Sequence, residues 1–88
     1  MIKNMKLYFF CDEGHGWLKV RRDVLAKFVD LTKVTSYSYV KNDDVYLEED
    51  CDAPLFLNAL KDAGVEFVVA SRYSSYRSRI RNYPRFIA

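Results

Sequence analysis

The sequence predicts an α+β protein, a two-layer sandwich in which a mostly antiparallel five-stranded sheet carries two helices on one face, in the order ββα-ββα-β. Two observations lead to this class. Short segments of alternating apolar and polar residues come in pairs joined by turn residues, which is typical of hairpins. Each pair precedes a segment whose apolar residues recur at helical spacing. With 88 residues, the chain is expected to form a single domain, 1–88.

The first half of the chain predicts one hairpin and one helix. The expected elements are a strand over residues 5–11, a turn over 12–16, a strand over 17–20 and a helix over about 21–31. Alternation in the first strand places Leu7 and Phe9 on one face and Tyr8 and Phe10 on the other. The glycines of the turn permit positive φ angles. Phe28 lies in the apolar stripe of the helix, so we expect it to anchor the helix in the core.

The second half predicts the same pattern followed by one more strand. The expected elements are a strand over residues 34–40, a polar turn over 41–44, a strand over 45–49, a helix over 51–63 and a strand over 65–70. Gly64 is expected to end the helix, and Leu60 to anchor it in the core. The near-continuous apolar run of the last strand predicts a central strand that is buried on both faces.

An acidic stretch, Glu48–Asp52, joins the fourth expected strand to the second helix. A helix N-terminus favours carboxylates because its amides are unpaired and carry partial positive charge. Asp50 or Asp52 is therefore expected to cap the helix, with Ala53 and Pro54 in its first turn. A cap and a solvated turn account for most of the acidity.

The C-terminal residues 72–88 mix arginine with large apolar side chains and have no clear periodicity. Leaving those side chains in water is costly, so residues 72–88 are expected to dock on the body of the domain. Their arginines are expected to pair with the acidic stretch while the aliphatic stems cover apolar surface. No acidic residue lies between Arg72 and Arg85, although the net charge of the chain is only +2. This segregation of charge favours either a charged partner or internal pairing.

The composition excludes several protein classes. Half of the residues are apolar and 16% are aromatic, which argues against disorder. No apolar run approaches the ~20 residues that cross a bilayer, and the first residues do not resemble a signal peptide. We therefore expect a cytoplasmic protein with no membrane contact. Cys11 and Cys51 are then expected to be reduced, with Cys11 buried and Cys51 moderately reactive.

Three segments carry a resemblance to known sequences. They are Gly14-His15-Gly16-Trp17-Leu18-Lys19-Val20, Tyr46-Leu47-Glu48-Glu49-Asp50-Cys51-Asp52-Ala53 and Ile80-Arg81-Asn82-Tyr83-Pro84. Over most of its length the chain resembles a set of short uncharacterised proteins of bacteriophages and bacteria. The resemblance implies a phage-borne or mobile-element accessory protein. It implies no catalytic or binding residues, because no activity is assigned to that set.

One candidate site is a surface for single-stranded nucleic acid. If both helices cover one face of the sheet, the other face displays aromatic rings on which bases can stack, beside arginines that can contact phosphates. The residues proposed for this surface are Tyr8, Phe10, Trp17, Tyr46, Arg72, Arg77, Arg79, Arg81 and Arg85. The alternative is that the same rings are covered by a second subunit or by Tyr83, Phe86 and Ile87.

Thiol, imidazole and carboxylate groups near the first turn offer two weaker hypotheses. Cys11, Asp12 and His15, joined by Cys51 or Asp50, could bind zinc, but the local set has three ligands where zinc takes four. A pair of His15 with either cysteine could act as a nucleophile, but the sequence shows no orienting group. We therefore expect no metal, no cofactor and no enzymatic activity.

The sequence favours a non-enzymatic binding protein that acts through protein–protein interaction. Arginine, tyrosine and tryptophan, which are enriched at interfaces, occur throughout the hairpins and residues 72–88. The expected partner is a host or phage protein, and single-stranded nucleic acid is the alternative. The sequence leaves the oligomeric state open.

Overall fold

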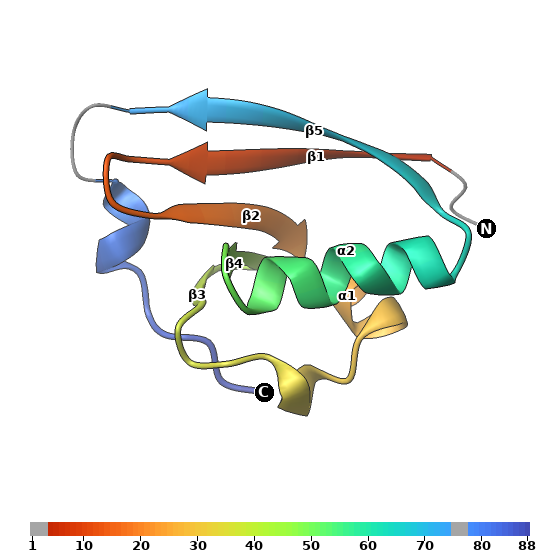
Figure 1. Ribbon diagram of the computed structural model, residues 1–88. Coiled ribbons are helices and arrows are strands. Elements are labelled where there is room, and N and C mark those ends of the chain that lie inside the picture. The colour runs from red at the N-terminus through yellow and green to blue at the C-terminus, as the bar shows by residue number, and fades with distance from the viewer. Residues whose placement is uncertain (1–3, 75–77) are drawn as a thin grey trace.

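A five-stranded sheet in the order β3-β4-β2-β1-β5 forms the centre of the protein (Figure 1). The computed structural model describes residues 4–74 and 78–88. Its elements are β1 (Asn4–Cys11), β2 (Gly16–Arg21), α1 (Arg22–Phe28), η1 (Leu31–Lys33), β3 (Tyr39–Lys41), β4 (Asp44–Glu48), α2 (Asp52–Asp62), β5 (Glu66–Tyr73) and η2 (Arg79–Asn82), where η marks a 3-10 helix. Neighbouring strands are antiparallel except β1 and β5, which are parallel. The predicted α+β class and the mostly antiparallel sheet are confirmed.

The larger apolar core lies between the two helices and one face of the sheet. Leu60 of α2 is fully buried there, as expected of a core anchor. Phe28, the last residue of α1, is only partly buried and places its ring centroid 6.1 Å from that of Phe56. The buried residues of this core are Leu7, Leu18, Val20, Leu25, Val29, Val34, Val45, Leu47, Ala53, Phe56, Leu60, Val65 and Phe86.

A smaller aromatic cluster covers part of the opposite face of the sheet. Its buried members are Trp17, Tyr39, Tyr46 and Ile80, with Phe10 and Tyr83 packed against them. Ile80 and Tyr83 come from residues 78–88, which we call the C-terminal strap. The strap therefore covers sheet surface on the side away from the helices.

The C-terminal strap also lies along β3, at one edge of the sheet (Figure 1). Phe86 is buried in the larger core, whereas the next residue, Ile87, is 79% exposed. Two backbone hydrogen bonds of 2.8 Å hold the strap in place, from Val40 N–H to the Pro84 carbonyl and from Phe86 N–H to the Ser38 carbonyl. The backbone of the β3 edge is therefore already engaged by this chain.

Strand β5 departs furthest from the prediction. It lies at the other edge of the sheet, because it pairs with β1 alone among the strands of residues 4–74 and 78–88. Val68, in the middle of its apolar run, is 63% exposed. The expectation of a central strand buried on both faces is therefore wrong. β5 lies on the outer side of β1, and its Phe67 is only partly buried against the larger core.

Residues 34–38, expected to be strand, form turns instead, and β3 has only three residues. The Asp52 carboxylate accepts hydrogen bonds from the N–H and hydroxyl of Thr35 and from the hydroxyl of Ser38. These bonds draw the segment toward α2 and compete with strand pairing. Within the described part of the chain, neither helix has the length and apolar character needed to cross a membrane.

Candidate functional site

A cleft of about 480 Å³ lies where the β1–β2 turn, the start of α2, the turns before β3 and the C-terminal strap meet. Arginine and carboxylate side chains share its walls with aromatic rings. Trp17, Arg81 and Arg85 are the predicted binding residues that it contains. The full lining is His15, Trp17, Tyr37, Tyr39, Glu48, Asp50, Cys51, Arg81 and Arg85.

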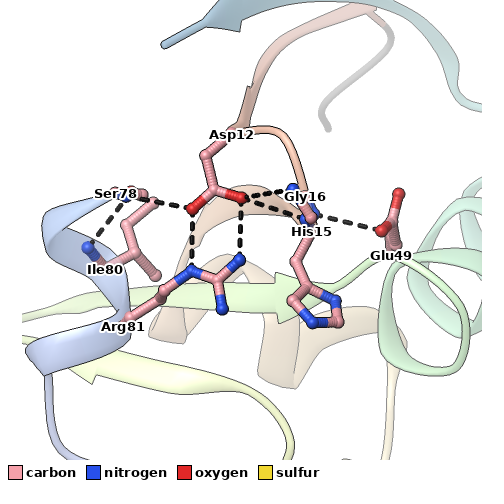
Figure 2. Close-up of polar contacts among 8 residues, drawn as sticks. Asp12, His15, Gly16, Glu49, Ser78, Ile80 and Arg81 are labelled. Carbon is pink, nitrogen blue, oxygen red and sulfur yellow. Dashed lines mark hydrogen bonds and ion pairs between the residues drawn. The ribbon is translucent and has the colours of Figure 1, made fainter. Parts of the chain in front are cut away.

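An ion pair between buried Asp12 and half-buried Arg81 anchors the strap beside this cleft (Figure 2). Asp12 is 7% exposed and accepts two hydrogen bonds from the guanidinium, from Nε at 2.7 Å and from Nη2 at 2.8 Å. The same carboxylate accepts the N–H groups of Gly14, His15 and Ser78, each at 3.0 Å. A bidentate, charge-assisted pair fixes direction as well as distance, so η2 is held firmly against the β1–β2 turn.

These hydrogen bonds also determine the ionisation of the pair. The bonds from Arg81 are the main reason that the pKa of the Asp12 carboxyl is held well below its usual range; burial opposes them, and the three backbone N–H groups add to them. The same interaction raises the pKa of Arg81. A carboxylate with these partners is engaged in structure, which weakens the zinc hypothesis that used it. Within the described residues, no three His, Cys, Asp or Glu side chains are grouped to hold a metal ion.

Gly16 is required for space and not for backbone conformation. The glycines of this turn permit positive φ, but among the described glycines only Gly64 has it. A Cβ atom on Gly16 would lie 2.2 Å from Cζ of Phe9, which no real contact allows. The N–H of Gly16 donates to Oε1 of Glu49 at 3.1 Å, which ties the turn to the segment before α2 (Figure 2).

Two arginine–aromatic stacks form walls of the cleft. The guanidinium of Arg81 lies 5.6 Å from the Trp17 ring centroid, and that of Arg85 lies 4.6 Å from the Tyr39 ring centroid. Nη1 of Arg85 also donates to the carbonyl of Ser36 at 3.2 Å. Both cations are therefore held in place before any ligand arrives. Tyr37, at the rim, is 61% exposed.

The acidic wall of the cleft differs from the predicted cap. Glu48, and neither Asp50 nor Asp52, accepts the amides before α2, from Asp50 N–H at 3.0 Å and from Cys51 N–H at 2.8 Å. Asp52 is buried and bonds Thr35 and Ser38, away from the helix terminus. The expected cap by Asp50 or Asp52 is wrong, because the loop hydroxyls compete for Asp52.

The aromatic face proposed for stacking bases is largely covered. Trp17 is 2% exposed and Tyr46 is also buried. The ring centroid of Tyr83, in the strap, lies 5.3 Å from that of Tyr46. Phe10 is half-buried in the same cluster. Tyr83 covers these rings as the alternative interpretation expected, but Phe86 and Ile87 do not, since Phe86 joins the opposite core and Ile87 points to solvent.

The five arginines of residues 72–88 do not form one surface. Arg81 pairs with Asp12, and Arg85 stacks in the cleft. Arg72 lies 5.4 Å from the ring centroid of half-buried Tyr8, while Arg79 is exposed. Arg77 lies outside the described residues. Within the described part of the chain, none of these arginines forms an ion pair with the acidic stretch Glu48–Asp52, so that expectation is wrong there.

The thiols and the histidine occupy separate settings. Both cysteines are free; Cys11 is half-buried and not fully buried as expected, and Cys51 is exposed. Desolvation and the carboxylates of Glu48, Asp52 and Asp50 raise the pKa of the Cys51 thiol. Because the thiolate is the nucleophile, a raised pKa makes Cys51 a poor one at neutral pH. His15 is exposed beside Trp17, with ring centroids 6.2 Å apart.

The sequence offers little signal for this site. Asp12 and Arg81 are 69 residues apart, and no local pattern pairs a turn carboxylate with one arginine among several. Tyr37 was expected in a strand, because the composition of residues 34–40 is strand-like, but it lies in a turn before β3. Comparisons of the chain with family models, with curated proteins and with solved structures give no match.

Proposed function

We propose that this protein acts by binding another protein, and that the cleft beside the strap receives a segment of that partner. The observation that carries the proposal is the pair of arginine–aromatic stacks, Arg81 on Trp17 and Arg85 on Tyr39, at the walls of an open cleft. Arginine, tyrosine and tryptophan dominate the energetics of interfaces. Side chains that are already held lose less conformational entropy on binding.

The chemistry of the cleft favours a partner segment that carries a carboxylate beside an apolar side chain. Among the described residues, no acidic side chain forms an ion pair with Arg85, so its guanidinium is available to an acid of the partner. The exposed ring of Tyr37 supplies apolar surface next to it. A volume of about 480 Å³ accommodates a few side chains and not a whole domain. The resemblance to phage and bacterial proteins supports a host protein as the partner.

The proposal is tested by affinity capture from nuclease-treated bacterial lysate. Tyr37→Ala and Arg85→Ala should each reduce the recovery of a captured protein by about tenfold, as expected when an interface anchor is removed. Ile87→Ala and Arg79→Ala are the controls, because both residues are exposed outside the cleft. Equal recovery with all four variants contradicts the proposal.

A second candidate is single-stranded nucleic acid, favoured by one observation. Lys6 and Arg72 lie 5.6 and 5.4 Å from the ring centroid of Tyr8, which places two cations around one half-buried ring. This candidate predicts binding of a single-stranded oligonucleotide that weakens steeply with salt and is reduced by Arg72→Ala. Fluorescence anisotropy measures both effects, and binding that does not vary with salt excludes it.

A further inference from the structure

We propose that β5 pairs with β5 of a second copy of this chain, antiparallel about a two-fold axis at Val69, so that two sheets become one. This inference is independent of the cleft. β5 has eight residues, Val68 in its middle is 63% exposed, and no described strand pairs with its outer side. A long apolar edge with open backbone groups is a template for pairing with another strand.

The charges of β5 are self-complementary about Val69. In an antiparallel pair centred there, residues equally distant from Val69 lie opposite each other, so Glu66 faces Arg72 of the second copy and Arg72 faces its Glu66. Opposite residues share a face, with Cβ atoms about 4.5–5.5 Å apart, which is within reach of an ion pair. If the axis is moved to Val68 or Ala70, Glu66 and Arg72 no longer lie opposite each other. Of these three registers, only the one centred on Val69 pairs the two charges.

The same register fills a hollow at the beginning of β5. A cavity of about 700 Å³ is lined by Asn4–Lys6 and Val65–Val68. Tyr73 of the second copy comes opposite Val65, and Tyr73 is among the exposed large side chains of a single copy. Its ring then covers apolar groups of the hollow. The assembly closes at two copies, because the β3 edge is already engaged by the strap.

The proposal is tested by measuring the oligomeric state of the full chain by sedimentation, for the wild type and for variants in which the charges at positions 66 and 72 are reversed. The wild type should show twice the monomer mass of 10.4 kDa. Glu66→Arg and Arg72→Glu each place like charges opposite at two symmetric positions, so each should weaken the dimer about tenfold or more. The double variant Glu66→Arg/Arg72→Glu should restore the dimer, while Arg79→Glu should leave it unchanged. A monomer at every concentration overturns the proposal, as does a dimer that both single variants leave intact.

The register is tested by cysteine cross-linking in a Cys51→Ser background. Residue 69 faces itself across the two-fold axis, so Val69→Cys should form a disulfide between copies under mild oxidation. Val68→Cys is the matched control, because residue 68 faces residue 70 of the other copy. Equal cross-linking of the two variants, or larger open-ended assemblies in place of a dimer, overturns the register.

Discussion

One edge of the sheet is covered by the chain itself, and the other is left open by the described residues. β3 has three residues, and the C-terminal strap lies beside it. The Pro84 carbonyl of the strap accepts a hydrogen bond from β3, and Phe86 packs in the larger core. β5 has eight residues and exposes Val68, with no described segment along its outer side. The short edge, which offers few groups for pairing, is the one that is covered. A chain that only needed to block stray pairing would cover the longer and more apolar edge.

The largest loss of folding stability is expected when the strap is loosened from the β3 edge at Phe86. Phe86→Ala removes a buried ring from the larger core and loosens the strap, so it should destabilise the protein by about 3–5 kcal/mol. Urea unfolding followed by circular dichroism measures the loss. Ile87→Ala is the control, since Ile87 is exposed and its removal should change little. Similar unfolding of the two variants would show that the strap does not support β3.

The next effect is at the other anchor of the strap. Asp12→Asn removes the charge that holds Arg81 and should lower the free energy of unfolding by about 2 kcal/mol. The Arg81 guanidinium and the Ser78 N–H both donate to the carboxylate, and the single oxygen of an amide cannot accept all of these hydrogen bonds. Asp23→Asn is the matched control, since the Arg21–Asp23 pair is exposed and contributes little. The two variants are compared by the midpoint of urea unfolding. Equal shifts of the midpoint would show that the Asp12–Arg81 pair does not anchor the strap.

A smaller effect is expected from pH. The pKa of Asp12 is lowered in the folded protein, so the unfolded chain binds its proton first as the pH falls. The stability that the Asp12 carboxylate contributes is fully present above the pKa of about 4 that it has in the unfolded chain, and it is lost as the pH falls toward the lower pKa of the folded protein. The unfolding midpoint of the wild type should therefore fall below about pH 4 more steeply than that of Asp12→Asn. Parallel profiles contradict the assignment.

The smallest effect on stability is expected at β5. Val68→Thr keeps the branched shape at an exposed position and should change the stability of the single chain by less than about 0.5 kcal/mol. Val45→Thr, at a fully buried position of β4, should be clearly destabilising, because it buries a hydroxyl. Thermal melts at low protein concentration measure both. A large loss from Val68→Thr would mean that β5 is covered after all.

The sequence predicts those parts of the fold that rest on local periodicity. Alternation in β1 and helical spacing around Leu60 give the correct faces, because apolar burial selects them directly. The place of β5 in the sheet cannot be predicted from local sequence. An apolar run indicates a buried strand, but Val68 lies in an edge strand and is exposed. Residues 34–38 have strand-like composition, yet hydrogen bonds to Asp52 outweigh it.

The candidate site was less predictable for the same reason. Arg81 and Arg85 were among the expected binding residues, but nothing in the sequence distinguishes the arginine that pairs with Asp12 from the one that stacks on Tyr39. Tertiary contacts assign those roles. Trp17, expected on an open face, is buried because the strap supplies Ile80 and Tyr83 over it.

The ion pair between Asp12 and Arg81 also has a consequence for the order in which this chain can fold during synthesis. The hairpin of β1 and β2 emerges before the strap, so its turn carboxylate and the ring of Trp17 gain Arg81 as a partner only after residue 81 has been made. Until then, Trp17 and Tyr46 present an aromatic face to other nascent chains. Contacts so distant in sequence form late, so these rings stay uncovered from the synthesis of Tyr46 to that of Arg81.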